Sequence, residues 1–297
     1  MTSGHNLLKT NLHKGVFTMK KFHVGVQLYS VKDAMAEDFE GTLEKIAEMG
    51  YEYVEFAGYY GRTAEEIKAL LDRLGLKCIS VHQSPEFFLE DMQKGIDYLK
   101  TFGTKYCVVP WWGRELLAGT EKWADTVSLF NKVADGLYQN GMMLGYHNHD
   151  FEFEKLDGKY LHDYLFEAIP SDRFVPELDT CWVHYAGLNP ADKIREFAGR
   201  VEIVHLKDFV CKRLGSGPVY DLIDADGNAM KTESKEDNGF EFCPLGRGRQ
   251  DFAEILKACE ESGTEYVIVE QDKVYHGMTE LEAVKISRDY LRDTFGL

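Results

Sequence analysis

The feature that most constrains the fold is an alternation between two kinds of segment along the chain. Short runs rich in β-branched and aromatic residues predict eight strands: His23–Leu28, Tyr53–Phe56, Lys77–His82, Tyr106–Val109, Met142–His147, Phe174–Asp179, Val201–Lys207 and Tyr266–Glu270. Between them lie segments with apolar residues at i, i+3 and i+4, a spacing that predicts amphipathic helices. Successive strands joined through helices run parallel, so the chain is expected to form one parallel sheet.

The helical segments carry their own start and stop signals. They are Asp38–Met49, Thr63–Leu74, Glu86–Phe102, Thr120–Asn140, Tyr160–Ala168, Ala191–Phe197, Gln250–Ser262 and Glu280–Asp293. Thr63 and Glu66 have the spacing of a capping box, and Asn189 before Pro190 marks another helix start. Glycines such as Gly75 and Gly263 follow helical runs, where a left-handed residue commonly ends a helix.

Eight strand-then-helix units in one chain predict the α/β class and a closed (β/α)8 TIM barrel. The alternative is an open, doubly wound sheet. The segment GVQLYS at the first strand has one glycine and lacks the GxGxxG fingerprint of a dinucleotide-binding open sheet. We therefore expect residues 21–297 to form a single barrel domain. Residues 1–20 precede the pattern and are expected to be a disordered or tag-like tail.

One segment interrupts the alternation. Lys212–Cys243 follows the seventh predicted strand and contains several glycines and the charged stretch KTESKEDNG. Connections between a strand and a helix are usually short, and a segment this long is commonly functional or mobile. In a barrel, an insertion after strand 7 is expected to lie over the mouth formed by the carboxyl ends of the strands.

Charge and composition exclude several classes of function. The 297 residues include 34 Lys and Arg against 50 Asp and Glu, which gives a formal net charge of −16. Binding to nucleic acid phosphates needs a basic surface, and binding to anionic membranes needs one as well. The chain has no run of about 20 apolar residues. Six scattered cysteines without a CxxC pair predict a reduced, cytoplasmic protein. Its partner is expected to be a small molecule, and a homo-oligomer is possible.

Polar side chains gather at the ends of the predicted strands, where a barrel carries its active site. They are Gln27, Glu55, His82, Trp111, Trp112, His147, His149, Glu152, Asp179, His205, Lys207 and Glu270. Burying such groups without partners costs several kcal/mol, and a purely structural barrel does not need so many of them. Taken singly, each has a structural interpretation: Asp179 as a helix cap, a histidine as a paired core residue, the tryptophans as packing at the rim.

A subset of these residues predicts a metal site. Asp179, His205 and Glu270 end three strands, and the segment YHNHDFEF offers His147, His149 or Glu152 as a fourth ligand. Carboxylates mixed with imidazole suit Mn²⁺, Zn²⁺ or Co²⁺, and Mg²⁺ is a further candidate. Without thiolate ligands, a catalytic site with open positions is favoured over a closed structural one.

Several strand-end motifs together resemble those of the sugar phosphate isomerase/epimerase superfamily, the xylose isomerase-like TIM barrels. The matching segments are GVQLYSVK, YVEFAGYYG, SVHQS, GYHNHDFEF, LDTCWVHYAGLNP, VHLKDF and VIVEQD, and the resemblance covers roughly residues 22–295. It implies one divalent metal ion bound by Glu, Asp, His and Glu from strands 5 to 8. The last three correspond to Asp179, His205 and Glu270. The first falls near His147, so Glu152 is expected to replace it.

The resemblance implies a metal-dependent sugar isomerase or epimerase that acts on a keto-sugar or cyclitol through an enediolate. His149, Glu152, Lys207 and Glu270 are the predicted catalytic residues. The alternative is a lyase or hydrolase acting on an inosose or a 3-keto-glycoside, by dehydration or glycoside cleavage. The departure at His147 favours this alternative, because a simple epimerase uses two glutamates. DNA repair of the endonuclease IV kind is opposed by the net charge.

Further residues are predicted to contact the substrate. The segment PLGRGRQDF resembles the family's glycine-rich loop and provides two arginines, which suit the recognition of carboxylates, phosphates or sugar hydroxyls. Trp182 and His184 follow Asp179 closely and could line the sugar pocket or simply pack. The predicted substrate-binding set is Gln27, Glu55, His82, Trp111, Trp112, His147, Trp182, His184, Arg247 and Arg249.

Overall fold

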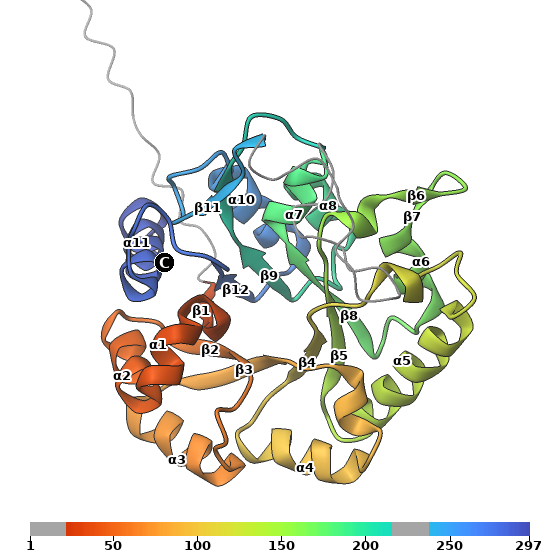
Figure 1. Cartoon of the computed structure of the whole chain (residues 1–297), viewed down its shortest axis with the longest axis horizontal. Helices are drawn as coiled ribbons and strands as arrows, with labels where there is room; N and C mark the ends of the chain where they lie inside the picture. The colour runs from red at the N-terminus through yellow and green to blue at the C-terminus, as the bar shows by residue number, and fades with distance from the viewer. Residues whose placement is uncertain (1–21, 216–237) are drawn as a thin grey trace, which may run out of the picture.

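The alternation seen in the sequence closes into a barrel in the computed structural model, which describes residues 22–215 and 238–297. Eight parallel strands follow one another around the barrel in the order β1-β12-β9-β8-β5-β4-β3-β2 (Figure 1). They are β1 (His23–Gln27), β2 (Tyr53–Ala57), β3 (Lys77–His82), β4 (Tyr106–Val109), β5 (Met143–His147), β8 (Phe174–Asp179), β9 (Ile203–Leu206) and β12 (Tyr266–Val269). The predicted (β/α)8 barrel is confirmed.

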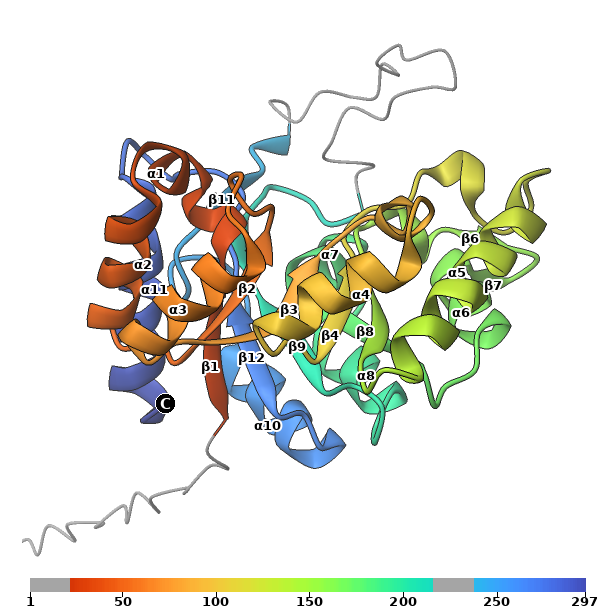
Figure 2. The same ribbon diagram turned by 90° about the horizontal axis from the view of Figure 1, so that it is seen from below.

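Helices surround the strands on the outside of the barrel (Figures 1 and 2). They are α1 (Lys32–Glu37), α2 (Phe39–Glu48), α3 (Ala64–Leu74), α4 (Met92–Thr101), α5 (Trp123–Tyr138), α6 (Leu161–Ala168), α7 (Thr180–Tyr185), α8 (Pro190–Glu196), α10 (Phe252–Ser262) and α11 (Glu280–Phe295). Short 3₁₀ turns cover Leu28–Val31, Pro85–Phe88, Arg114–Leu116 and Phe151–Phe153. The main hydrophobic core fills the layer between the strands and this outer ring.

Local signals placed the helix ends well. Thr63 and Glu66 form the predicted capping box, and Asn189 caps the helix that begins at Pro190. One prediction was too long: Glu86–Phe102 is divided into a 3₁₀ turn and α4, because the Asp91 side chain accepts from Lys94 N and starts a new helix there. The short helices α1 and α7 were not predicted, since six residues are too few to show a helical period.

The interior of the barrel divides into two layers. Side chains alternate along each strand, so every second residue points inward. At the amino ends of the strands the inward residues form a separate apolar cluster of Tyr53, Ile79, Tyr106, Val108, Val175, Ile203 and Ile268. Toward the carboxyl ends they are polar and charged: Gln27, Glu55, Ser80, His82, His147, Glu177, Asp179 and His205 are each buried or nearly so. The barrel therefore carries its buried charges at the mouth.

Two small antiparallel pairs stand apart from the barrel. β6 (Lys155–Leu156) pairs with β7 (Lys159–Tyr160), and β10 (Asp208–Val210) pairs with β11 (Glu241–Cys243). The second pair places the last three residues of the predicted insertion Lys212–Cys243 beside the segment that precedes it. Residues 216–237 of that insertion, and the predicted tail at 1–20, lie outside the described residues.

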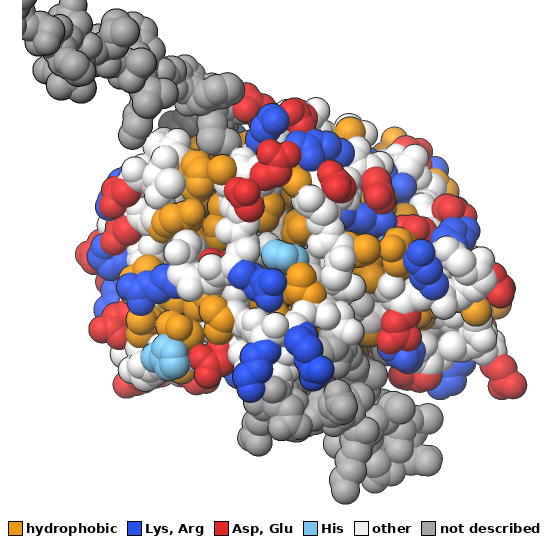
Figure 3. Space-filling view, turned by 90° about the horizontal axis from the view of Figure 1, so that it is seen from above, with side chains coloured by type: hydrophobic (Ala, Val, Ile, Leu, Met, Phe, Trp, Pro, Cys, Tyr) orange, Lys and Arg blue, Asp and Glu red, His pale blue; other side chains and the backbone are white. Residues whose placement is uncertain are grey.

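On the face shown in Figure 3, acidic and basic side chains are interspersed among hydrophobic ones. The six cysteines form no disulfide in the described parts of the chain, as the sequence predicted. Among the helices that the structure describes, none has both the length and the apolar character needed to cross a membrane.

Candidate active site

Four side chains at the mouth form a compact set of possible metal ligands, here called the outer group: His147, Asp179, His205 and Glu270. Their ligand atoms all lie within 4.8 Å of one another. The four come from β5, β8, β9 and the residue after β12, which are consecutive strands of the barrel. Each side chain is buried. Closure of the barrel therefore brings together residues up to 123 positions apart in sequence.

The two carboxylate oxygens of Asp179 have different roles: one caps a helix, and the other faces the mouth of the barrel. Its Oδ1 accepts from the backbone N–H groups of Cys181 and Trp182, at 2.7 and 3.2 Å, and so caps α7. Its Oδ2 is buried and lies 3.3 Å from Lys207 Nζ and 3.5 Å from His147 Nε2. The structural interpretation as a helix cap and the functional one as a ligand are thus both compatible with this residue.

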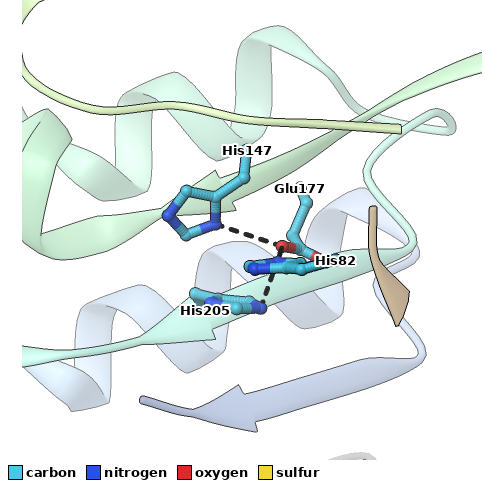
Figure 4. A group of neighbouring side chains, drawn as sticks. All are labelled: His82, His147, Glu177 and His205. Atoms are coloured by element: carbon cyan, nitrogen blue, oxygen red, sulfur yellow. Dashed lines mark hydrogen bonds and ion pairs between the residues drawn. The ribbon is translucent and has the colours of Figure 1, made fainter. Parts of the chain in front are cut away.

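Beneath the outer group lies a second set, here called the inner group: His82, His147, Glu177 and His205 (Figure 4). Figure 4 shows the three imidazole rings converging on the Glu177 carboxylate. Glu177 Oε1 lies 2.7 Å from His82 Nε2, 3.1 Å from His147 Nδ1 and 3.0 Å from His205 Nε2. His147 and His205 belong to both groups, each with one ring nitrogen toward Glu177 and the other toward the mouth.

Glu55 adds a second carboxylate to the inner layer. Its Oε1 is 3.0 Å from both His82 Nε2 and His205 Nε2, and its carboxylate also accepts from Gln27 and Ser80. Burial by itself lowers the pKa of His82, but the charges of Glu55 and Glu177 outweigh it and raise that pKa to about 10. Burial would raise the pKa of Glu55, but His82 and His205 hold it well below its usual range.

Lys207 brings a positive charge to the mouth. Its Nζ lies 3.3 Å from Asp179 Oδ2, 3.0 Å from Glu270 Oε2 and 2.6 Å from Asp272 Oδ1. Burial raises the pKa of Asp179 to about 7, and the neighbouring ammonium opposes this only in part. For Glu270 the attraction of Lys207 and His205 outweighs burial and holds the pKa well below its usual range. An ammonium among carboxylates in a buried mouth is a candidate proton donor.

His149 lies among aromatic rings on the strand-5 side of the mouth. Its ring centroid is 4.8 Å from that of Trp111 and 5.5 Å from that of Trp182, and the ring of Phe151 lies stacked against it at 6.1 Å. Burial, with a smaller contribution from Lys207, lowers the pKa of His149 to about 3. The imidazole is therefore neutral at pH 7, the form that accepts a proton.

Glu152, predicted as the fourth metal ligand, lies outside both groups. Its Oε1 accepts from the Tyr146 hydroxyl at 2.8 Å and its Oε2 from His149 N at 2.9 Å. The turn at Phe151–Phe153 directs this side chain behind β5, because Tyr146 points away from the barrel interior and packs in the outer core. The geometry brings His147 to the mouth instead, and burial raises the pKa of Glu152 to about 8.

Other predicted residues are more scattered. Trp112 is buried and donates to Thr126 Oγ1 at 3.0 Å, so it packs behind the barrel, whereas Trp111 is 40% exposed beside His149. Trp182 is fully buried against Phe240 and Phe242 as well as His149.

His184 Nδ1 contacts Gln250 Oε1 at 2.8 Å. Arg247 and Arg249 contact Met278 and Cys211, and no contact with the outer group is observed for them within the described ranges.

Sequence reasoning missed Glu177, which contacts three of the histidines. A signal for it exists: in FVPELD, Glu177 and Asp179 are two residues apart and so point the same way from a strand.

Sequence reasoning also missed Asp208, whose buried carboxylate accepts from the N–H groups of Phe209, Gly246, Gly248 and Gln250 at 2.8–3.2 Å. Asp208 thereby holds the glycine-rich loop against the end of β9. A Cβ on Gly248 would lie 2.1 Å from Asp208 Oδ1, so the loop requires glycine there.

The outer group fits a divalent transition-metal ion. It offers two imidazole nitrogens and two carboxylate oxygens, a donor set that suits Zn²⁺, Mn²⁺, Co²⁺ or Fe²⁺. The buried Oδ2 of Asp179 makes no hydrogen bond of good geometry, although Lys207 Nζ lies 3.3 Å away, and it is oriented toward that set. Both histidines have a carboxylate behind the ring, as metal-ligating histidines usually do.

Comparison with known proteins gives consistent results. The family described as xylose isomerase-like TIM barrel matches residues 43–294. An inosose dehydratase of Geobacillus kaustophilus strain HTA426 is 28% identical over 189 residues, which is 56% of this chain and 61% of that protein. An inosose dehydratase of Clostridium perfringens strain 13 is 23% identical over 282 residues, 87% of this chain and 91% of that protein.

Solved structures share the fold. A sugar phosphate isomerase/epimerase from Parabacteroides distasonis ATCC 8503 has a TM-score of 0.68 at 21% identity, with 95% of this chain and 98% of that chain covered. L-ribulose 3-epimerase has a TM-score of 0.66 at 15% identity, covering 93% and 95%. The IolI protein, solved with a zinc atom, has a TM-score of 0.66 at 15% identity, covering 92% and 98%.

Proposed function

The chain belongs to the xylose isomerase-like TIM barrel family, and from that premise we propose that it is a divalent-metal-dependent enzyme acting on a keto-cyclitol or keto-sugar. The observation that carries the proposal is the outer group, in which His147, Asp179, His205 and Glu270 converge at the mouth within 4.8 Å. Fold alone does not imply an activity, so the argument rests on these side chains and their neighbours.

In this proposal the metal is held by His147 Nε2, Asp179 Oδ2, His205 Nδ1 and Glu270, with His147 in the position that the sequence assigned to Glu152. A bound divalent ion supplies Lewis acidity toward the substrate's carbonyl oxygen. The chain's own contribution is orientation: Glu177 supports both imidazoles from below, and the α7 cap fixes Asp179.

His149 and Lys207 are the proposed proton-transfer groups. The neutral imidazole of His149 accepts the proton from the carbon next to the carbonyl, and Trp111 and Trp182 beside it restrict water. The Lys207 ammonium lies 3.3 Å from Asp179 Oδ2 and 3.0 Å from Glu270 Oε2, so it would be close to the oxygens of a substrate bound at the outer group. It can give a proton to a departing hydroxyl.

The reaction we favour is the elimination of water from an inosose or a similar β-hydroxy ketone, the lyase alternative raised by the sequence. The C–H bond beside the carbonyl breaks as His149 takes the proton, and its electron pair forms the new C=C bond. The C–O bond of the β-hydroxyl breaks, and Lys207 Nζ supplies the proton that makes the leaving group water. One base and one acid suffice, and the relatives described as inosose dehydratases support this choice.

Isomerisation or epimerisation is the second candidate. A two-base epimerase needs an acid–base group on each face of the carbon, and His147 is engaged by Glu177 at 3.1 Å and by the outer carboxylates. The observation that favours the second candidate is the hold on Lys207 by three carboxylates, Asp179, Glu270 and Asp272. If that hold keeps the ammonium from the leaving oxygen, the proton returns to carbon and no water is lost.

The test is product analysis in D₂O. Protein stripped of metal and reloaded with Mn²⁺, Zn²⁺, Co²⁺ or Mg²⁺ is incubated with an inosose and followed by NMR. Loss of water, seen as a hydroxy-enone or as the diketone to which it tautomerises, indicates elimination, and a new stereoisomer carrying deuterium indicates epimerisation. His149→Ala should keep the metal and lower turnover by about 10²–10⁴. The matched control is His23→Ala, at the opposite end of the barrel. No bound metal and no exchange with solvent would refute the proposal.

A further inference from the structure

We propose that Glu177 is a positioning residue that fixes one N–H on Nδ1 of His147 and one on Nε2 of His205, so that the two histidines bind a metal ion as opposite tautomers, each through the nitrogen at the mouth. The part of this inference that concerns metal binding rests on the proposed function, whereas the part that concerns His147 in the metal-free protein does not. Glu177 does not itself belong to the outer group.

The contacts define which nitrogen faces which way. Glu177 Oε1 lies 3.1 Å from Nδ1 of His147 but 3.0 Å from Nε2 of His205. The remaining nitrogens face the outer carboxylates: His147 Nε2 is 3.5 Å from Asp179 Oδ2, and His205 Nδ1 is 3.0 Å from Glu270 Oε2. A neutral imidazole has one N–H, and a carboxylate only accepts. Each nitrogen that faces Glu177 therefore carries an N–H, on Nδ1 in His147 and on Nε2 in His205. In the metal-free protein His205 Nδ1 also faces a carboxylate and carries a second N–H, which a metal ion replaces when it binds there.

The strand register explains why one carboxylate selects opposite tautomers. β8, which carries Glu177, lies between β5 and β9 in the barrel. His147 is paired in register with Glu177, whereas His205 is paired with Asp179, two residues closer to the mouth. His147 thus reaches sideways with its proximal Nδ1 and upward with Nε2. His205 starts higher, reaches down with its distal Nε2 and keeps its proximal Nδ1 at the mouth.

The fixed tautomers matter because a metal binds only a nitrogen without a proton. A negative charge behind each ring also makes the opposite nitrogen a stronger donor, and loss of such a partner typically costs 10- to 100-fold in metal affinity. Glu55 provides an internal comparison, because its Oε1 lies 3.0 Å from Nε2 of both His205 and His82. Of the two histidines that belong to both the outer and the inner group, Glu55 contacts His205. Glu55 is buried in the same layer as Glu177.

The first experiment reads the tautomers directly by long-range ¹H–¹⁵N NMR at pH 8. In the metal-free protein His147 should carry its proton on Nδ1. In the Zn²⁺-loaded protein His205 should carry its proton on Nε2, with Nδ1 shifted by the metal. Two histidines with the proton on the same nitrogen type would overturn the proposal. If wild-type protein binds no Zn²⁺, the proposed function fails, and the His147 tautomer still decides this inference.

The second experiment compares two isosteric variants of the same layer, Glu177→Gln and Glu55→Gln. By chelator competition, Glu177→Gln should raise the Kd for Zn²⁺ by about 10- to 100-fold and lose the Nδ1–H preference of His147. Glu55→Gln should leave the His147 tautomer unchanged and raise the Kd less, because Glu177 still supports His205. Circular dichroism verifies that both variants are folded. An unchanged Kd and unchanged tautomers in folded Glu177→Gln would refute the role.

Discussion

The two ends of the barrel interior are built from the same strands and differ completely in chemistry. At the amino ends, inward residues such as Val175 and Ile203 form an apolar cluster. Two residues further along the same strands, Glu177 and His205 are just as buried and carry charges. Both layers obey the same alternation, but only the apolar layer is stabilised by burial alone.

The difference shows what a buried charged layer requires. Moving ionised groups out of water is costly, and that cost is offset only where every group finds partners. In the mouth layer Glu177 contacts three histidines and Lys207 contacts three carboxylates. The network is therefore sensitive to the removal of any member, whereas the apolar layer responds mainly to lost volume. The following experiments test that contrast, from the largest expected effect to the smallest.

The largest effect is expected from removing a proposed ligand. His147→Ala, Asp179→Ala, His205→Ala and Glu270→Ala should each reduce bound metal from about one ion per chain to a small fraction, because a site with one ligand missing binds far more weakly. Elemental analysis of purified protein measures this. Glu202→Gln, at the amino end beside Lys105, is the matched control and should keep its metal. Full metal content in all four ligand variants would show that the mouth is not the metal site.

The apolar layer should show the opposite behaviour. Ile203→Ala removes a fully buried side chain two residues before His205 and should lower the free energy of unfolding by about 2–5 kcal/mol. Urea unfolding measures the loss. Metal content per folded chain should stay at the wild-type level, because the outer group is one layer away. If Ile203→Ala releases metal as readily as His205→Ala does, the two layers are not independent.

His162 offers a buried histidine whose ring is surrounded mainly by aromatic side chains, with one carboxylate oxygen, Asp163 Oδ1, 3.5 Å from its Nδ1. Its ring lies against Phe153, Phe166 and Phe197, and burial lowers its pKa from 6.5 to about 4, although Asp163 opposes this. Because the folded pKa lies below the unfolded one, the unfolded chain takes up the proton first as the pH falls. Stability is then fully present above pH 6.5 and decreases by roughly 3 kcal/mol down to pH 4.

The measurement for His162 is the pH dependence of the free energy of unfolding in wild type and in His162→Phe. His162→Phe gives up the 3.5 Å contact between His162 Nδ1 and Asp163 Oδ1, and phenylalanine fits the aromatic surroundings. The free energy of unfolding of the variant should therefore change less between pH 6.5 and 4 than that of the wild type. Lys193 Nζ, 3.0 Å from Asp163 Oδ1, can still pair with that carboxylate in the variant. Identical slopes in the two proteins would exclude His162 as the cause.

The smallest effect is expected at Glu152. Since its carboxylate accepts from Tyr146 and His149 N behind the strand, Glu152→Gln can keep both contacts. The Kd for Zn²⁺ should change by far less than the roughly tenfold that loss of a supporting partner costs. Chelator competition provides the value. A loss of metal as large as that in Asp179→Ala would restore Glu152 as the fourth ligand and remove His147 from that role.

Much of the fold could be predicted because its signals are local. The strands Lys77–His82, Tyr106–Val109 and Phe174–Asp179 were predicted with the bounds that the structure gives. The Thr63 cap and the start at Pro190 depend on side chains within three or four residues of each other. Alternation also placed Asp179, His205 and Glu270 at one end of the barrel, since parallel strands end at the same edge.

What only the tertiary structure decided is how those strand ends meet. After His149 the chain turns so that the Glu152 side chain lies behind the strand, where its Oε1 accepts from the Tyr146 hydroxyl. The two residues between His149 and Glu152 do not by themselves indicate this direction. The convergence on Glu177 depends on β8 lying between β5 and β9 and on a two-residue offset in register. The backbone fixes the spacing of side chains along one strand, so that spacing can be predicted from the sequence. Distances between strands are fixed only when the barrel closes, so the partners of each buried charge follow from closure.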